Sequence, residues 1–156
     1  MMTFQPDWAP SLHPLVVHFP IALLIAAVAA DVCALLLPRA VSSTAVATLL
    51  YPVGALSALV AYLTGRQAAA TALLPGMAHA IVLDHWNWAL ATTICFSAIA
   101  AIRLAVPWWR PPPRWVRPAL TVAALFGIVL LYFTGEQGAR LVYEQGVGVR
   151  VPTMRR

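Results

Sequence analysis

Residues 14–37 read PLVVHFPIALLIAAVAADVCALLL, an apolar run interrupted by only one imidazole and one carboxylate. A helix needs about 20 mainly apolar residues to cross the hydrocarbon core of a bilayer. Pro14 suits a first helical turn, because its missing N–H would have no partner there, and Pro38 cannot continue the helix. The stretch therefore predicts a transmembrane helix.

Three further apolar runs, 46–65, 77–106 and 118–134, are long enough to do the same. The chain of 156 residues is 62% hydrophobic and 10% charged, whereas soluble domains are about half apolar and a quarter charged. Its mean hydropathy is +0.81. We expect one domain, 1–156: an all-α membrane protein forming a four-helix transmembrane bundle in lipid, followed by an interfacial segment over 137–149.

The two halves of the chain repeat a pattern. The second run ends Tyr62-Leu63-Thr64-Gly65, and the fourth ends Tyr132-Phe133-Thr134-Gly135. The runs before them, the first and the third, each open with two histidines. These features predict two helical hairpins in the same orientation, related by a pseudo-two-fold axis along the membrane normal.

Because successive helices cross the membrane in opposite directions, most of the polar residues are expected at one membrane face. That face receives all four histidines and two arginines that follow the second and fourth helices: His13, His18, His79, His85, Arg66 and Arg140. The short loop Trp108–Arg117 is dense in arginine, which favours a cytoplasmic location. Both termini and the histidines are then periplasmic. Juxtamembrane arginines also account for the pI near 10.0 without a nucleic-acid partner.

The deeper histidines predict a cofactor site. The repeat makes His18 and His85 equivalent, so we expect them to face one another across a bundle diagonal of roughly 11–14 Å. That gap suits one iron with two axial nitrogens, as in a b-type haem with bis-His ligation that passes electrons. Arg66 and Arg140 could pair with the propionates. His13 and His79 would then hydrogen-bond to the ligands or propionates, or to interfacial water and carbonyls.

Other interpretations of the polar residues stay open. Three or four imidazoles could hold copper or zinc, although His13 and His18 are about 140° apart around a regular helix. Pro14 could leave His13 outside that helix. The chain could also be a non-redox metal-binding subunit or a proton-coupled transporter that uses the histidine cluster. Asp31 could serve a proton path, or it could pair with one of two arginines, Arg39 or Arg103.

Two segments carry a family resemblance: His13-Pro14-Leu15-Val16-Val17-His18-Phe19-Pro20-Ile21-Ala22-Leu23 and Leu141-Val142-Tyr143-Glu144-Gln145-Gly146-Val147-Gly148-Val149. Together they resemble an uncharacterised family of small bacterial four-helix membrane proteins, sometimes joined to c-type cytochrome domains. The resemblance covers nearly the whole chain. It implies a bacterial inner-membrane protein associated with redox chemistry. We expect an electron-transfer component rather than an autonomous enzyme, with a periplasmic c-type cytochrome or a respiratory complex as partner; oligomerisation stays open.

Overall fold

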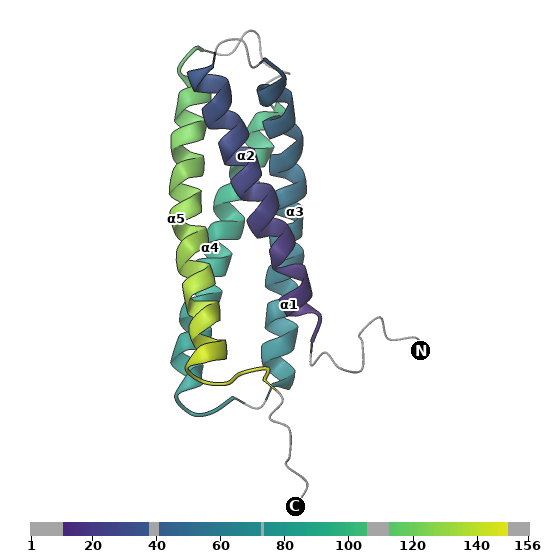
Figure 1. Cartoon of the computed structure of the whole chain (residues 1–156), viewed down its shortest axis with the longest axis vertical. Coiled ribbons are helices and arrows are strands. Elements are labelled where there is room, and N and C mark those ends of the chain that lie inside the picture. Colours follow the sequence, from purple (N-terminus) through teal and green to yellow (C-terminus); the bar gives the residue numbers. More distant parts are fainter. Residues whose placement is uncertain (1–10, 38–40, 73, 106–112, 150–156) are drawn as a thin grey trace, which may run out of the picture.

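The computed structural model describes residues 11–37, 41–72, 74–105 and 113–149. Its regular elements within those ranges are all helices (Figure 1). In chain order they are α1 His13–Val16, α2 His18–Leu36, α3 Val41–Thr71, α4 Ala78–Ala105 and α5 Val116–Tyr143. The all-α fold class is confirmed.

The first membrane-spanning run is divided into α1 and α2 at Val17. Pro20 has no N–H to donate to the carbonyl of Val16, so the ordinary helical bond is missing there. The next bond, from Ile21 N to Val17 O, is long at 3.5 Å. Val17 itself keeps helical backbone angles (φ −60°, ψ −25°), so α1 and α2 together form one membrane span.

Helices α3 and α5 are longer than the sequence predicts. The Thr64-Gly65 and Thr134-Gly135 pairs, expected to end the helices, lie inside them. Glycine within a helix costs only about 1 kcal/mol relative to alanine, which favourable neighbours can offset. Most of the expected interfacial segment continues α5 to Tyr143, and turns with positive φ at Gly146 (63°) and Gly148 (79°) follow. Helix α4 agrees closely with the predicted 77–106.

The helices form an up-and-down bundle of two hairpins (Figure 1). α2 packs along α3, α4 packs along α5, and α3 packs against α4 between the hairpins. The remaining seam, α2 against α5, is the most sparsely packed of the four. The two-hairpin architecture is therefore as the sequence predicts, with one open side.

Four helical segments are long and apolar enough to cross a membrane: His13–Leu36, Thr44–Thr71, Ala78–Ala105 and Val116–Tyr143. Large apolar side chains cover the outside of the bundle, including Phe19 (63% exposed), Leu49 (71%) and Phe126 (60%). Such a surface is compatible with lipid and not with water. The chain is an integral membrane protein.

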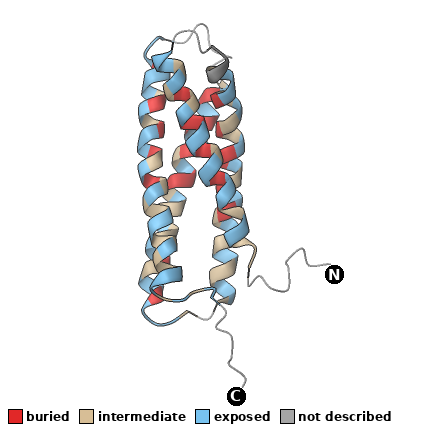
Figure 2. Ribbon diagram, in the orientation of Figure 1, coloured by how far each residue is buried: buried red, intermediate tan, exposed pale blue. Residues whose placement is uncertain are grey.

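The packed core lies mainly in the half of the bundle away from the histidines (Figure 2). The largest fully buried side chains are Tyr51, Phe96 and Leu24, and small alanines from α2, α3 and α5 fill the space around them. Small residues let membrane helices approach closely. The histidine half contains fewer large buried side chains.

Candidate functional site

Two histidines meet inside the bundle, near the end at which α1 and α4 begin. The ring centroids of His13 and His85 are 6.2 Å apart, and the ring planes are inclined at 80°. His13 comes from α1 and His85 from α4, so the pair joins the two hairpins. Both residues are half-buried. This pair is the most concentrated arrangement of imidazoles in the described part of the chain.

The His13 ring is oriented by α3. Its Nδ1 lies 3.0 Å from the carbonyl oxygen of Ala61 and 3.4 Å from Oγ1 of Thr64. A carbonyl only accepts, so Nδ1 carries the proton and donates it. In the neutral ring, Nε2 is then left with a free lone pair. The Thr64 hydroxyl itself donates to carbonyls of its own helix, at Val60 and Ala61.

The His85 ring is oriented in the same way by α5. Its Nδ1 donates to the carbonyl oxygen of Thr134 at 3.0 Å. The Thr134 side chain is held by Leu130 O at 2.9 Å and by Thr92 Oγ1 at 3.0 Å. His85 therefore also presents an Nε2 that can accept a hydrogen bond or bind a metal.

The two histidine units match each other in detail. Each accepting carbonyl lies four residues before a glycine on the same helix: Ala61 before Gly65, and Thr134 before Gly138. A Cβ on Gly65 would lie 2.9 Å from Cε1 of His13, and one on Gly138 would lie 3.3 Å from Cε1 of His85. The two hairpins therefore hold their histidine rings by corresponding contacts.

The register of this repeat differs from the one expected. The histidines are 72 positions apart (13 to 85) and their glycines 73 (65 to 138), whereas the Thr-Gly pairs are 70 apart (64 to 134). The difference of three residues is about one helical turn. The residue equivalent to His85 is therefore His13 and not His18.

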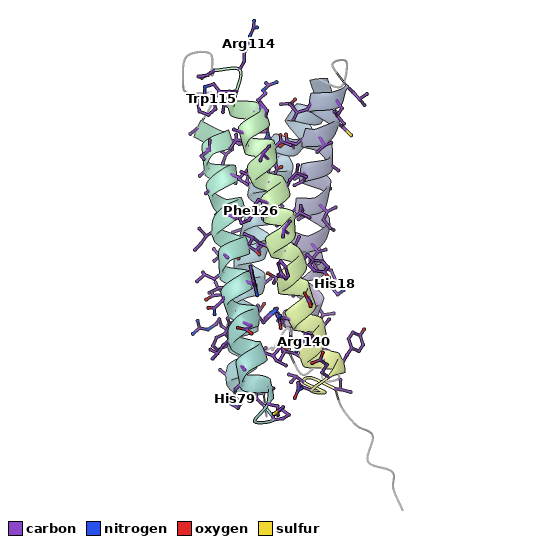
Figure 3. The ribbon with its side chains drawn as sticks, turned by 90° about the vertical axis from the view of Figure 1, so that its left-hand side faces the viewer. His18, His79, Arg114, Trp115, Phe126 and Arg140 are labelled. Carbon is purple, nitrogen blue, oxygen red and sulfur yellow. The ribbon has the colours of Figure 1, made fainter. Side chains whose placement is uncertain are left out.

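The other two histidines do not join the pair. His18 and His79 are both exposed (Figure 3). The expectation that His18 faces His85 across the bundle is wrong. His13 faces inward, and His18, five residues further along the same span, lies about 140° around the helix axis and is exposed. Among the described residues, no three His, Cys, Asp or Glu side chains lie close enough together to hold a metal ion.

The two expected arginines lie near the same end of the bundle. The Arg66 guanidinium is 4.4 Å from the ring centroid of Trp86, and its Nη1 donates to the Tyr62 hydroxyl at 3.3 Å. This contact joins α3 to α4. Arg140 (Figure 3) donates from Nε to Glu144 at 3.1 Å and from Nη1 to Gln137 at 3.3 Å. Arg66 is exposed and Arg140 half-buried, so both are accessible to an anionic group.

An open groove runs along the α2–α5 seam. Its volume is about 480 Å³. Its α5 wall includes Gly135 and Ala139, and Ile21 and Ile25 form the α2 wall. The lining is mostly apolar but includes Tyr132 and Glu136, and neither histidine belongs to it. The groove is therefore separate from the imidazole pair.

The opposite half contains a separate buried polar network. Arg103 on α4 forms an ion pair with Asp31 on α2, and the Tyr51 hydroxyl donates to the same carboxylate at 3.0 Å. The Arg103 guanidinium also lies 4.7 Å from the Tyr51 ring centroid. The prediction that Asp31 pairs with an arginine is confirmed for Arg103, while Arg39 lies outside the described residues.

Sequence reasoning missed the inward position of His13 and the role of the glycines. The available signal was the five-residue spacing of His13 and His18, which places the two rings about 140° apart and lets only one of them face the bundle axis. For Gly138 no such signal existed, since three other glycines lie within about ten residues of it. Only the packing of α4 on α5 identifies Gly138 as the glycine that contacts the His85 ring.

These features define a class: a four-span, all-α integral membrane protein with an inward-facing imidazole pair. A family model described as "Predicted membrane protein (DUF2231)" matches residues 9–151. The chain belongs to that family, as the sequence resemblance suggested. No curated protein and no solved structure matches it.

Proposed function

We propose that this protein binds one b-type haem between His13 and His85 and passes electrons. The observation that carries the proposal is the ring pair itself: two imidazoles from different hairpins, each with Nδ1 tied to a carbonyl. Donation of one ring nitrogen to a carbonyl is the usual way in which a metal-binding histidine is oriented. It leaves Nε2 of both rings as the ligand atom.

The ring separation fits two axial bonds to one metal. A metal–imidazole nitrogen bond is about 2.0–2.1 Å. A ring nitrogen lies about 1 Å from its centroid, so two imidazoles on opposite sides of one ion have centroids roughly 6 Å apart. The 6.2 Å between His13 and His85 agrees with that separation.

The number of ligands favours a haem over a bare ion. Zinc is ordinarily held by three or four protein ligands, but the described residues bring only two imidazoles together. A porphyrin supplies four nitrogens in a plane, so two axial imidazoles complete the coordination of its iron. Two histidines alone are therefore sufficient for haem and insufficient for a typical copper or zinc site.

Charged side chains near the imidazole pair suit the propionates of a haem. Neither histidine belongs to the lining of the α2–α5 groove, so that groove is not part of the proposed haem site. Arg66 and Arg140 lie near the same end and suit pairing with propionates. In this arrangement the protein supplies axial ligation, an apolar environment and charge pairing, which together set the reduction potential.

The site's location suggests a partner on the periplasmic side. Arg114 and Arg117 lie in and just after the loop at the end of the bundle remote from the histidines, and arginines there are typical of a cytoplasmic face. The imidazole pair would then lie near the outer face of a bacterial inner membrane. A periplasmic c-type cytochrome, or a respiratory complex, is the expected electron partner.

Absorption spectra of detergent-purified protein test the proposal. We expect a low-spin haem spectrum that is lost in His13→Ala and in His85→Ala. His18→Ala and His79→Ala are matched controls, because they remove exposed imidazoles from the same two helical segments. Loss of the spectrum in His18→Ala but not in His13→Ala would contradict this ligand assignment. A colourless protein that takes up copper or zinc, but not added haem, would replace the haem with a metal ion.

A further inference from the structure

We infer that Gly65 and Gly138 are positioning residues, which allow each imidazole to reach the carbonyl that fixes its ligand nitrogen. This inference rests on the proposed function, because it describes how the two ligands of that site are held. The two glycines come from different helices, α3 and α5, and each lies against a different histidine ring. Neither glycine is in a turn or has a positive φ. A need for unusual backbone angles therefore does not explain why glycine occupies positions 65 and 138.

The space above Gly65 is filled by the His13 ring. A Cβ at this position would lie 2.9 Å from Cε1, 3.2 Å from Nδ1 and 3.3 Å from Nε2 of that ring. Carbon atoms in favourable contact are about 3.5–4.0 Å apart. A side chain at position 65 would therefore push the ring away from α3. The Nδ1 donation to Ala61 O, now 3.0 Å, would lengthen or break.

Gly138 has the same relationship to His85, with more room. Its Cβ would lie 3.3 Å from Cε1 and 3.5 Å from Nδ1 of the ring. A shift of a few tenths of an ångström would relieve this contact. The bond from His85 to Thr134 O is then weakened rather than lost. We therefore expect alanine at either position to weaken the Nδ1 hydrogen bond of the neighbouring histidine, and the effect to be larger at position 65 than at position 138.

Gly135 provides a matched control on the same helix as Gly138. A Cβ there would meet nothing within 4 Å. Alanine favours a helix over glycine, so none of the three substitutions weakens its helix intrinsically. Any difference among Gly65→Ala, Gly138→Ala and Gly135→Ala therefore reports on the rings and not on helix formation.

The first measurement uses haem-free protein in detergent with ¹⁵N-labelled histidine. Nuclear magnetic resonance distinguishes the ring nitrogen that carries the proton. We expect Gly65→Ala to abolish the fixed Nδ1–H form of His13 and to leave that of His85 unchanged. Gly138→Ala should weaken only the His85 signal, and Gly135→Ala should change neither. Unaltered His13 signals in Gly65→Ala would overturn the inference.

The second measurement uses the haem-loaded protein. Loss of a partner that orients a ligand typically lowers metal affinity about 10- to 100-fold. We expect a loss of this size in Gly65→Ala, a smaller loss in Gly138→Ala and none in Gly135→Ala. The potential should rise in Gly65→Ala, because an imidazole without its carbonyl partner is less basic and stabilises ferric iron less.

The outcomes separate this inference from the proposed function. If no variant, nor the wild type, binds haem, the proposed function fails, and the tautomer measurement still decides the role of the glycines. If haem binds equally well and at the same potential in all three variants, the positioning role is wrong while haem binding stands. Ordered losses in both measurements support the two together.

Discussion

Asp31 on α2 and Arg103 on α4 form a buried ion pair that joins diagonal helices of the bundle. Both side chains are more than 90% buried, and Tyr51 from α3 adds a hydrogen bond and a ring face. Ionisable groups at membrane depth are costly unless they are paired. The network ties three of the four spans together at a level distant from the histidines.

Removing one member of this pair should destabilise the protein strongly. Asp31→Ala leaves the Arg103 guanidinium buried without a counter-charge, so we expect a loss of about 3–5 kcal/mol in the free energy of unfolding. Asp31→Leu combined with Arg103→Met should recover most of that loss. Unfolding in mixed micelles measures it, with the exposed Asp84→Ala as control. Equal stability of Asp31→Ala and Asp84→Ala would contradict the prediction.

The packed half should be sensitive to a single methyl group at Gly127. A Cβ there would lie 2.7 Å from Cζ of the fully buried Phe96. Overpacking of a dense core costs typically about 1–3 kcal/mol, and we expect Gly127→Ala to fall in that range. Thermal unfolding in detergent measures this loss of stability, with Gly135→Ala as the control variant. Adding Phe96→Leu should relieve the effect, and a failure to do so would place its cause elsewhere.

Arg66 should contribute to cofactor retention without being a ligand. If its guanidinium pairs with a propionate, Arg66→Leu removes a charge-assisted bond worth about 1.5–3 kcal/mol. We expect faster haem loss to an acceptor protein with an unchanged low-spin spectrum. Arg117→Leu, an exposed arginine at the other end, is the control. Identical rates of haem loss for the two variants would exclude Arg66 as a propionate partner.

The orientation in the membrane is testable with reporter fusions. A reporter after Arg156 should be active in the periplasm, and one inserted at Pro113 should be active in the cytoplasm, because one span, Val116–Tyr143, separates the two positions. The reverse pattern would invert the protein and place the imidazole pair at the inner face. The same compartment for both reporters would contradict the four-span fold itself.

The fold could be predicted from the sequence because a bilayer requires only that each spanning helix be long and apolar enough. A span needs length and apolar content, and both are visible in residues such as those of 14–37. The choice between His13 and His18 was not accessible in this way. A spacing of five residues puts the two rings about 140° apart, so only one of them can face the bundle axis. Which one does so depends on how the helix is rotated against its neighbours, and the sequence does not report that rotation.

The repeat illustrates the same limit. Thr64-Gly65 and Thr134-Gly135 are the most similar short segments of the two halves, so they appeared to be equivalent. In three dimensions Gly65 is equivalent to Gly138, one turn further along α5. Small shifts between packed helices change which residues meet without changing the hydropathy pattern. Sequence similarity over four residues therefore located the region of the site and not its register.

The concentration of large buried side chains in one half of the bundle has a consequence for how this family can diversify. Tyr51, Phe96, Leu24 and the ion pair hold the helices together at a distance from the imidazoles. Substitutions around the rings leave these contacts in place, so we expect them to change ligand chemistry with little loss of the fold. The bundle separates the residues that hold it together from those that surround the imidazoles.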